Sequence, residues 1–319
     1  MKAIRIHEFG GAENLRVDEI DKPTPETGEV LIKVAAAGIN FADTMLRQNK
    51  YLFSPELPFT LGFEVAGTVE SVGDNVTNVQ VGQRVLATIR GGGYAEYAVA
   101  NAATVVSIPD GLGFGAATAL LVQGLTAFGL IVDLKAGQTI LVHAAAGGVG
   151  TLLVQLAKRR GAKVIGTASN TEKLEKVAAL GADHAINYTE ADWTDQVLEA
   201  TGRKGADVII EMVGGEIGRS NVKILAIGGT MHVYGAASGE DFPISALSLL
   251  GKAQTVKGYN LNLETPENMY KFTGELMQLI AADALKIEVT EFPLEEAAEA
   301  HNALEGRKTT GKVVLTTNA

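Results

Sequence analysis

The feature that most constrains the fold of this chain is the segment Leu141–Gly150, which reads LVHAAAGGVG. An apolar strand pattern at Thr139–Val142 leads into this turn of small residues, and an amphipathic helix pattern at Thr151–Arg160 follows it. In such a strand–turn–helix unit, the backbone N–H groups at the start of the helix bind a pyrophosphate. The segment therefore predicts a dinucleotide-binding site.

The spacing of the glycines supports this prediction. The fingerprint G-x-G-x-x-G occurs here as Ala145-x-Gly147-x-x-Gly150, and a second strand follows at Lys163–Thr167. Gly147 would let the backbone approach the phosphates, and Gly150 would let the helix and the strand pack closely. The predicted phosphate contacts are the backbone N–H groups of Gly147, Gly148, Val149 and Gly150.

Strand and helix patterns alternate beyond this turn, and the strands are apolar enough to be buried on both faces. This alternation predicts a parallel, doubly wound α/β sheet. The predicted strands are Thr139–Val142, Lys163–Thr167, His184–Asn187, Val208–Glu211, Gly229–Val233 and Thr255–Tyr259. The predicted helices are Thr151–Arg160, Thr171–Leu180, Thr194–Thr201 and Ile217–Leu225.

The first part of the chain has a different pattern. Up to about Pro109, short β-rich runs such as Val30–Ala36 and Val65–Val72 are separated by Gly, Pro, Asn and Asp turns, which predicts a mostly antiparallel β domain. The last predicted strand, Gly311–Thr316, is too short for a domain of its own, so we expect it to pack on the N-terminal unit. The nucleotide domain is then an insertion, with residues 1–114 and 260–319 in one domain and 115–259 in the other.

Composition limits the class of protein. Lys and Arg number 27 against 37 Asp and Glu, and the resulting charge of −10 disfavours a nucleic-acid partner. No apolar run is long enough to span a bilayer, so no membrane association is expected. The chain has no cysteine, which excludes disulfides and thiolate metal sites and is typical of a cytoplasmic protein.

The end of the second strand bears on the choice of coenzyme. NAD-selective sites place Asp or Glu there to bind the ribose 2′-hydroxyl, whereas this strand continues into Ser169 and Asn170, with Lys173 just beyond. A hydroxyl and an ammonium suit a 2′-phosphate, so the sequence favours NADPH, with Ser169 and Lys173 as phosphate contacts. The alternative for Lys173 is a solvated helix charge, paired with the neighbouring Glu172.

Several separate segments resemble one known family over essentially the whole chain. They are Ala37–Asp43, Leu61–Gly67, Gln123–Thr126, His143–Gly150 and Gly181–Tyr188. The chain resembles the zinc-independent medium-chain dehydrogenase/reductases, and most closely their NADPH:quinone oxidoreductase branch, which includes zeta-crystallin. This resemblance implies a Rossmann nucleotide domain inserted in a GroES-like catalytic domain.

The resemblance also indicates why no catalytic metal is expected. Zinc-dependent relatives place Cys, His and Cys at the positions of Asn40, Phe63 and Gln123, and two amides and a phenyl ring cannot form a zinc ligand set. Alcohol oxidation that needs a Lewis acid is therefore disfavoured. Metal-free hydride transfer to a small electrophilic acceptor, a quinone or an enone, needs no such help.

The predicted catalytic residues are Asn40 and Tyr51, on the side of the first domain where the nicotinamide should meet the acceptor. By resemblance, the Asn40 amide donates to the acceptor carbonyl or to the nicotinamide ribose; the alternative is an Asx-turn. Tyr51 corresponds to a proton-donating tyrosine of related enoyl reductases, or else it only forms a wall of the pocket. Asp43 and Glu64 are each expected to hold a turn or a hydrogen-bond network.

The remaining predicted coenzyme contacts come from the resemblance and from strand ends. The resemblance assigns Lys173 and Tyr188 to the adenosine phosphate, Arg307 to a further phosphate contact, and Thr126 to the nicotinamide carboxamide. Gly235 and Tyr259 follow strands at the edge where doubly wound sheets bind ligands.

Three functions stay open at this point. A quinone reductase comes first, an enone, 2-alkenal or enoyl-thioester reductase second, and an NADPH-binding regulatory or structural protein with little turnover third. We also expect a homodimer, because relatives pair through the outer strand of the nucleotide sheet. The predicted edge is Thr230–Val233, with Val256 and Tyr259 nearby.

Overall fold

The computed structural model describes residues 1–317, which divide into two compact units. Unit 1 contains residues 1–122 together with the chain from 287 onward, and unit 2 contains residues 123–286. Unit 2 is thus an insertion in unit 1, as the sequence predicted. Each unit has a hydrophobic core of its own.

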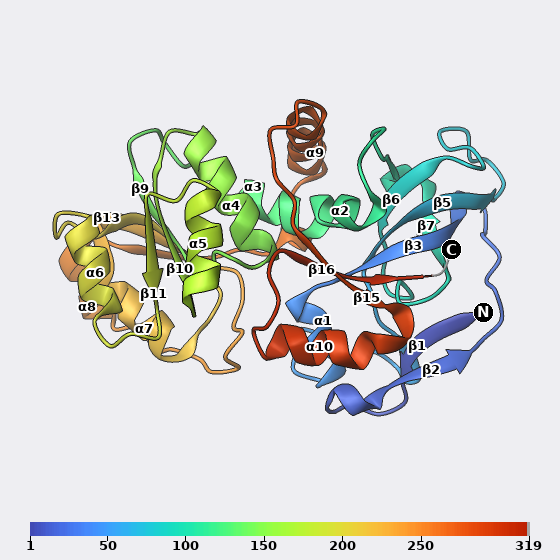
Figure 1. Cartoon of the computed structure of the whole chain (residues 1–319), viewed down its shortest axis with the longest axis horizontal. Coiled ribbons are helices and arrows are strands. Elements are labelled where there is room, and N and C mark those ends of the chain that lie inside the picture. The colour runs from blue at the N-terminus through green and yellow to red at the C-terminus, as the bar shows by residue number, and fades with distance from the viewer. Residues whose placement is uncertain (318–319) are drawn as a thin grey trace. The chain divides into compact units, whose positions relative to one another are not determined.

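Unit 2 is built on a parallel six-stranded sheet, which lies at the left of Figure 1, in the order β11-β10-β9-β12-β13-β14. Counted along the chain from β9, this order is the 3-2-1-4-5-6 order of a doubly wound nucleotide-binding fold. The predicted fold class is therefore confirmed. The strands are β9 (Thr139–Val142), β10 (Lys163–Ala168), β11 (His184–Asn187), β12 (Ala206–Glu211), β13 (Leu225–Val233) and β14 (Thr255–Gly258).

Helices connect these strands, and the first of them starts earlier than predicted. Gly148, Val149 and Gly150 belong to the helix and not to the turn before it, despite the low helix propensity of glycine. One further helix, Ala246–Lys252, was missed because its 7 residues are too few to show a helical repeat in the sequence. The helices are α4 (Gly148–Arg159), α5 (Thr171–Ala179), α6 (Trp193–Ala200), α7 (Gly215–Ile224) and α8 (Ala246–Lys252).

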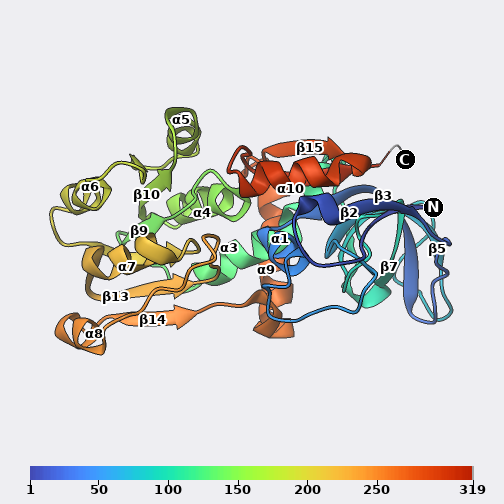
Figure 2. The ribbon, with the colours of Figure 1, turned by 90° about the horizontal axis from the view of Figure 1, so that it is seen from below.

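The outer edge of this sheet differs from the prediction. Residues Thr230–Val233 pair with β12 on one side and with β14 on the other, so β13 is an inner strand. The edge strand is β14, and Figure 2 shows it beside β13 as the outermost strand of the sheet. The prediction of Thr230–Val233 as the edge was wrong, because β14 pairs along its whole length with that segment.

Unit 1 is mostly antiparallel β structure, as predicted. Its main sheet has the order β15-β16-β3-β5-β6-β8, with β7 also paired to β3, and β2-β1-β4 form a second sheet. The main-sheet strands are β3 (Glu29–Ile39), β5 (Glu64–Val72), β6 (Arg84–Thr88), β7 (Tyr97–Asn101), β8 (Val106–Ser107), β15 (Val289–Pro293) and β16 (Lys312–Thr316). The second sheet contains β1 (Lys2–Ile6), β2 (Leu15–Glu19) and β4 (Phe59–Thr60).

The C-terminal segment completes unit 1. Strand β16 pairs antiparallel with the end of β3, joining Val313 to Ile39 and Leu315 to Ala37, and Figure 1 shows the red β16 beside the blue β3. Helix α10 (Ala297–Glu305) packs on α1 (Phe41–Arg47), where the Arg47 guanidinium lies 2.8 Å from the Glu305 carboxylate. The prediction that the last strand returns to the N-terminal unit is confirmed.

Both boundaries between the units lie further along the chain than the predicted 114/115 and 259/260. Helix α2 (Phe114–Thr118) packs on β3 and β5, and the Arg84 guanidinium lies 4.6 Å from the centre of the Phe114 ring. Helix α9 (Pro266–Ala281) packs on α3 (Leu125–Leu130) through stacked rings of Phe272 and Phe128. These apolar contacts place α2 in unit 1 and α9 in unit 2.

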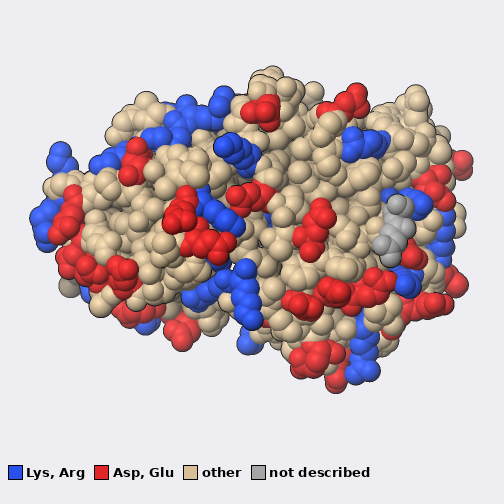
Figure 3. Space-filling view, in the orientation of Figure 1, with Lys and Arg blue, Asp and Glu red and all other residues tan. Residues whose placement is uncertain are grey.

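Two surface properties complete the description. Within residues 1–317, no helix has the length and apolar character needed to cross a bilayer. On the face drawn in Figure 3, lysine and arginine side chains are interleaved with aspartate and glutamate. The excess of acidic residues is thus distributed among basic ones on this face.

Candidate functional site

The glycine turn of unit 2 has the geometry that backbone phosphate binding requires. Ala144 adopts a left-handed conformation with φ 49°, and the Gly147 N–H donates to the Ala144 carbonyl at 2.8 Å. A side chain at Gly150 would place its Cβ 2.3 Å from that same carbonyl, so only glycine fits there. The first N–H groups of α4 have no partner within the helix and are the donors that an anion would meet.

Gly148 is required for a second reason. A Cβ at this position would lie 2.2 Å from the side-chain oxygen of Gln123, so the start of α4 passes directly over that amide. The turn therefore approaches its neighbours closely at two of its glycines. A phosphate cradle of this kind, which any Cβ would fill, fits a dinucleotide.

The structure brings the predicted adenosine-phosphate contacts to one place in unit 2. Ser169 follows β10, Asn170 caps α5 by accepting from the Lys173 N–H at 3.0 Å, and Lys173 lies in the first turn of that helix. The Tyr188 N–H donates to the Ala168 carbonyl at 3.1 Å, which holds Tyr188 beside the end of β10. Residues 166–171 include no carboxylate.

The alternative for Lys173, a solvated helix charge paired with Glu172, stays open. The Glu172 carboxylate lies 3.4 Å from the ammonium of Lys176, one turn further along α5. The start of this helix thus combines a lysine and a serine at a helix N-terminus, which is a donor set for a phosphate.

A buried polar network, which the sequence analysis did not identify, lies beneath these turns. The Glu211 carboxylate accepts from the Gly214 N–H at 2.7 Å and from the Asn221 amide, so the amide oxygen of Asn221 faces His143. His143 therefore donates from Nε2 to Asn221 at 2.8 Å and accepts at Nδ1 from the Thr167 hydroxyl at 2.9 Å. All four side chains are fully buried.

This network ties together the carboxyl ends of β9, β10 and β12. His143 comes just before the glycine turn, Thr167 just before Ser169 and Glu211 just before the turn at Gly214, and Asn221 joins them from α7. His143 is a buried, hydrogen-bonded histidine that connects neighbouring strand ends. A histidine inside an apolar strand was the only sequence signal of this arrangement.

The other predicted coenzyme residues of unit 2 are placed as follows. Gly235 follows β13, where a Cβ would lie 3.2 Å from Met212, so the chain passes close to the end of β12. Thr126 is buried in α3. Tyr259 packs against Gly129 of α3, where a Cβ would meet its hydroxyl oxygen, and burial raises the pKa of this phenol. Contacts of these residues with a coenzyme stay predictions.

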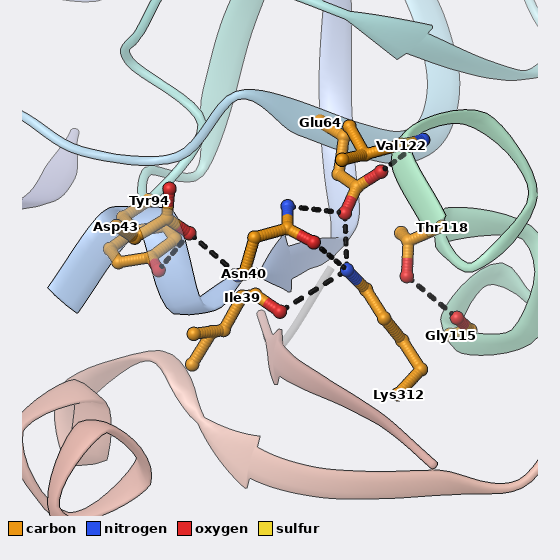
Figure 4. A network of polar contacts seen from close by, with 9 residues as sticks. All are labelled: Ile39, Asn40, Asp43, Glu64, Tyr94, Gly115, Thr118, Val122 and Lys312. Atoms are coloured by element: carbon orange, nitrogen blue, oxygen red, sulfur yellow. Dashed lines mark hydrogen bonds and ion pairs between the residues drawn. The ribbon is translucent and has the colours of Figure 1, made fainter. Parts of the chain in front are cut away.

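In unit 1, Asn40 lies at the junction of β3 and α1, inside a charged network shown in Figure 4. Its amide nitrogen donates to Glu64 at 2.8 Å, and its amide oxygen accepts from the Lys312 ammonium at 3.2 Å. Lys312 and Glu64 form a buried ion pair. The other Glu64 oxygen accepts from the Val122 N–H at 3.1 Å.

Asp43 holds the start of α1, as expected. Its carboxylate accepts from the Asn40 N–H at 2.8 Å and from the Tyr94 hydroxyl at 2.9 Å. The single Tyr94 proton is thereby used, so His301 donates from Nε2 to the Tyr94 oxygen at 3.1 Å. Burial raises the pKa of Asp43 to about 7 and lowers the pKa of His301 to about 3.

Tyr51 belongs to a cluster of aromatic rings in unit 1. Its ring centre lies 5.9 Å from that of Phe53, and Phe53 lies 6.4 Å from Phe63, both in edge-to-face geometry. Burial, and then the Asp43 carboxylate, raise the pKa of the Tyr51 phenol. The phenol therefore keeps its proton at neutral pH and can donate it.

Arg307, the additional phosphate contact that the resemblance implies, is exposed after the end of α10 with φ 56°.

Comparison with known proteins places this chain in a family. Residues 26–110 match the alcohol dehydrogenase GroES-like domain, and residues 148–278 match the zinc-binding dehydrogenase domain. The chain is 37% identical to the quinone oxidoreductase of Mus musculus, over 99% of this chain and 97% of that protein. It is also 37% identical to the quinone oxidoreductase of Pseudomonas aeruginosa, over 98% and 99%. The chain belongs to the quinone oxidoreductase family.

Solved structures agree with this family assignment. The Escherichia coli quinone oxidoreductase in complex with NADPH superposes with a TM-score of 0.93 at 33% identity, over 99% of this chain and 100% of that one. A mycobacterial protein in complex with NADPH gives a TM-score of 0.93 at 38% identity, over 99% and 100%. The resemblance seen in the sequence is therefore confirmed.

One matched domain of this quinone oxidoreductase family member is named for zinc. Two of the positions at which zinc-dependent relatives place ligands are Phe63 and Asn40 in this chain. The Phe63 ring packs in the aromatic cluster, and the Asn40 amide is bonded to Lys312 and Glu64. Within residues 1–317, no group of three or more His, Asp or Glu side chains is arranged to hold a metal ion. The site is built from hydrogen-bond donors and aromatic rings.

Proposed function

We propose that this chain reduces quinones with NADPH by metal-free hydride transfer. The observation that carries the proposal is the phosphate-binding arrangement of unit 2. A glycine cradle opens α4, while the end of β10 offers Ser169 and Lys173 in place of a carboxylate. Full-length similarity to proteins named quinone oxidoreductases supports the reaction class.

The residues of unit 2 would bind and orient the coenzyme. The N–H groups of Gly147–Gly150 would hold the pyrophosphate, and Ser169, Lys173 and Tyr188 would hold the 2′-phosphate and the adenosine. We assign Gly235, Tyr259 and Thr126 to further coenzyme contacts, with Arg307 of unit 1 as an additional phosphate partner. NADPH, when bound, supplies the hydride.

The residues of unit 1 would act on the acceptor. The Asn40 amide would donate a hydrogen bond to the oxygen on which negative charge develops, and one such donor contributes about 3 kcal/mol to a transition state. Tyr51, protonated at neutral pH, would give a proton, and the rings of Phe53 and Phe63 would contact a flat acceptor.

The phenol of Tyr51 beside Phe53 favours a second candidate, the reduction of enones or 2-alkenals. Hydride addition to a carbon–carbon double bond leaves a carbanion that needs a proton, and a phenol that is protonated at neutral pH carries one. A quinone needs this donor less, because its reduced oxygens take protons from water.

Oxidation of NADPH by a panel of acceptors tests the proposal. NADPH absorbance is followed anaerobically with 1,4-benzoquinone, 1,2- and 1,4-naphthoquinone, and with 2-hexenal and 3-buten-2-one as enone controls. We expect turnover with quinones at a kcat/KM at least tenfold above that for the enones. Faster enone reduction would make the second candidate the function. NADPH binding without turnover of any acceptor would favour a regulatory protein.

We further propose that the protein is a cytoplasmic homodimer. The edge strand β14 leaves one side of the unit 2 sheet open for pairing with a second copy, and α8 beside it exposes Leu247 and Leu250. The absence of cysteine from the sequence is consistent with a reducing compartment.

A further inference from the structure

Lys312 begins β16 and is almost completely buried, with its ammonium fully enclosed in unit 1. Each of its three N–H groups has a partner. The ammonium donates to the Ile39 carbonyl at 3.2 Å, to the Asn40 amide oxygen at 3.2 Å and to the Glu64 carboxylate. Removing two charges from water is unfavourable, so such a pair is weak evidence for stability and asks for another explanation.

The fold makes room for this ion pair. A Cβ at Gly38 would lie 2.5 Å from Glu64 Oε1 and 2.7 Å from Lys312 Cε, so β3 carries a glycine where the two side chains cross it. The network is completed from three distant parts of the sequence, since Gly38 lies near the end of β3 and Asn40 directly after it, Glu64 opens β5 and Lys312 opens β16.

The two charges fix the direction of the Asn40 amide. An ammonium has only donors and a carboxylate has only acceptors, so the amide oxygen must face Lys312 and the amide nitrogen must face Glu64. A rotation of the amide by 180° would bring the oxygen against the carboxylate and the N–H groups against the ammonium. The cation on the amide oxygen also polarises the amide and strengthens its N–H groups as donors.

We propose that Lys312 and Glu64 are positioning residues that aim the Asn40 amide at the oxygen of the acceptor. This inference rests on the proposed function, in which Asn40 stabilises the charge that develops on the acceptor during hydride transfer. In that role Asn40 would touch the acceptor and Lys312 would act through Asn40; Figure 4 shows the Lys312 ammonium against the Asn40 amide oxygen. The contribution of the pair is then made in the transition state, so its loss lowers kcat and leaves NADPH binding unchanged.

The test uses the double variant Lys312→Met/Glu64→Gln in the full-length protein. Its side chains keep the approximate volume of the pair without leaving one buried charge alone, so the fold is retained. We expect kcat for a quinone to fall about 100-fold, the loss typical of one misplaced oxyanion donor, with an unchanged Kd for NADPH. A kcat within twofold of that of the unaltered protein would overturn the proposal.

A double-mutant cycle separates positioning from general destabilisation. Asn40→Ala should lower kcat by a similar factor, and adding Lys312→Met/Glu64→Gln to it should cause little further loss. Losses that multiply would overturn the proposal. The control is Arg47→Met/Glu305→Gln, which removes another ion pair of unit 1 away from Asn40 and should change the melting temperature but not kcat.

A spectroscopic measurement keeps this inference separable from the proposed function. In the ¹⁵N spectrum, the Asn40 side-chain amide should show two resolved, slowly exchanging protons that merge or broaden in Lys312→Met/Glu64→Gln. If the unaltered protein reduces no acceptor, the proposed function fails, while this spectral change would still support positioning of the amide. An Asn40 amide signal that is identical in both proteins would overturn the positioning.

Discussion

At the scale of single residues, the selection of the coenzyme depends on what stands at the end of β10. Ser169 and Lys173 lie at the start of α5, whose N-terminus favours an anion, and the Glu172 carboxylate lies 3.4 Å from the Lys176 ammonium. A 2′-phosphate there would meet a hydroxyl and an ammonium. This arrangement predicts a preference for NADPH that depends on one ammonium.

Lys173→Glu should therefore raise the KM for NADPH about tenfold or more and change the KM for NADH much less, because a carboxylate repels the 2′-phosphate that only NADPH carries. Steady-state kinetics with both coenzymes measure the effect. Lys176→Glu is the matched control, since it makes the same charge change one turn further along α5. Equal effects of Lys173→Glu on the two coenzymes would remove this residue from the phosphate site.

Tyr51 offers a second prediction at this scale. Tyr51→Phe keeps the ring against Phe53 and removes only the hydroxyl. If the phenol gives a proton to carbon, enone reduction should slow about 100-fold while quinone reduction changes little. Tyr97→Phe serves as a control, because that ring lies under the Lys22 ammonium elsewhere in unit 1. Unchanged enone turnover would leave Tyr51 as a wall of the pocket only.

At the scale of elements, α1, α10 and Tyr94 meet around a buried carboxyl. The folded-state pKa of Asp43, about 7, lies above its ordinary value of 3.8, so folding takes up a proton in this interval. The contribution of Asp43 to stability is fully present below pH 3.8 and is lost as the pH rises through 7. The contribution of His301 to stability has the opposite pH dependence, because its pKa is lowered from 6.5 to about 3. That contribution is fully present above pH 6.5 and is lost as the pH falls through 3.

Asp43→Asn should isolate the first of these effects. The difference in free energy of unfolding between Asp43→Asn and the unaltered protein should shift in favour of the variant as the pH rises from 4 to 7, since the variant has no buried charge to form. Urea unfolding at several pH values measures it. A difference that stays constant over this interval would show that Asp43 does not titrate there.

The sequence predicted the elements of unit 2 well, because its strands are buried on both faces and end at recognisable turns. Strands β9 and β11 begin and end at the predicted residues. The sequence-based prediction missed α8, which buries no side chain. It also misplaced the edge of the sheet, because the position of a strand in a sheet depends on which other strands pair with it. In the candidate site the sequence predicted Asn40 but gave no sign of Lys312, because a lysine that opens an apolar strand looks like an ordinary strand boundary.

At the scale of the whole molecule, the proposed dimer depends on the edge strand β14. The Tyr259 N–H donates to β13, and because strand N–H groups alternate, the Gly258 N–H faces away from it, toward the open edge. Proline is tolerated at a strand edge but has no N–H to give.

Gly258→Pro should therefore convert a dimer into a monomer. Light scattering after gel filtration should give twice the 33.4 kDa of one chain for the unaltered protein, and 33.4 kDa for Gly258→Pro. NADPH binding by the variant confirms that unit 2 remains folded. A variant that remains dimeric would place the interface elsewhere, and an unaltered protein of 33.4 kDa would exclude the dimer.

The insertion of unit 2 into unit 1 has a consequence for synthesis on the ribosome. All residues of the nucleotide sheet are synthesised before Val289, whereas the end of β3 has no β16 to pair with until Lys312 and the residues after it are made. Unit 2 can thus fold first, while the end of β3 in unit 1 has no β16 to pair with. A nascent chain halted between Val289 and Lys312 would contain the whole nucleotide sheet, while Glu64 and Asn40 would still lack the Lys312 ammonium.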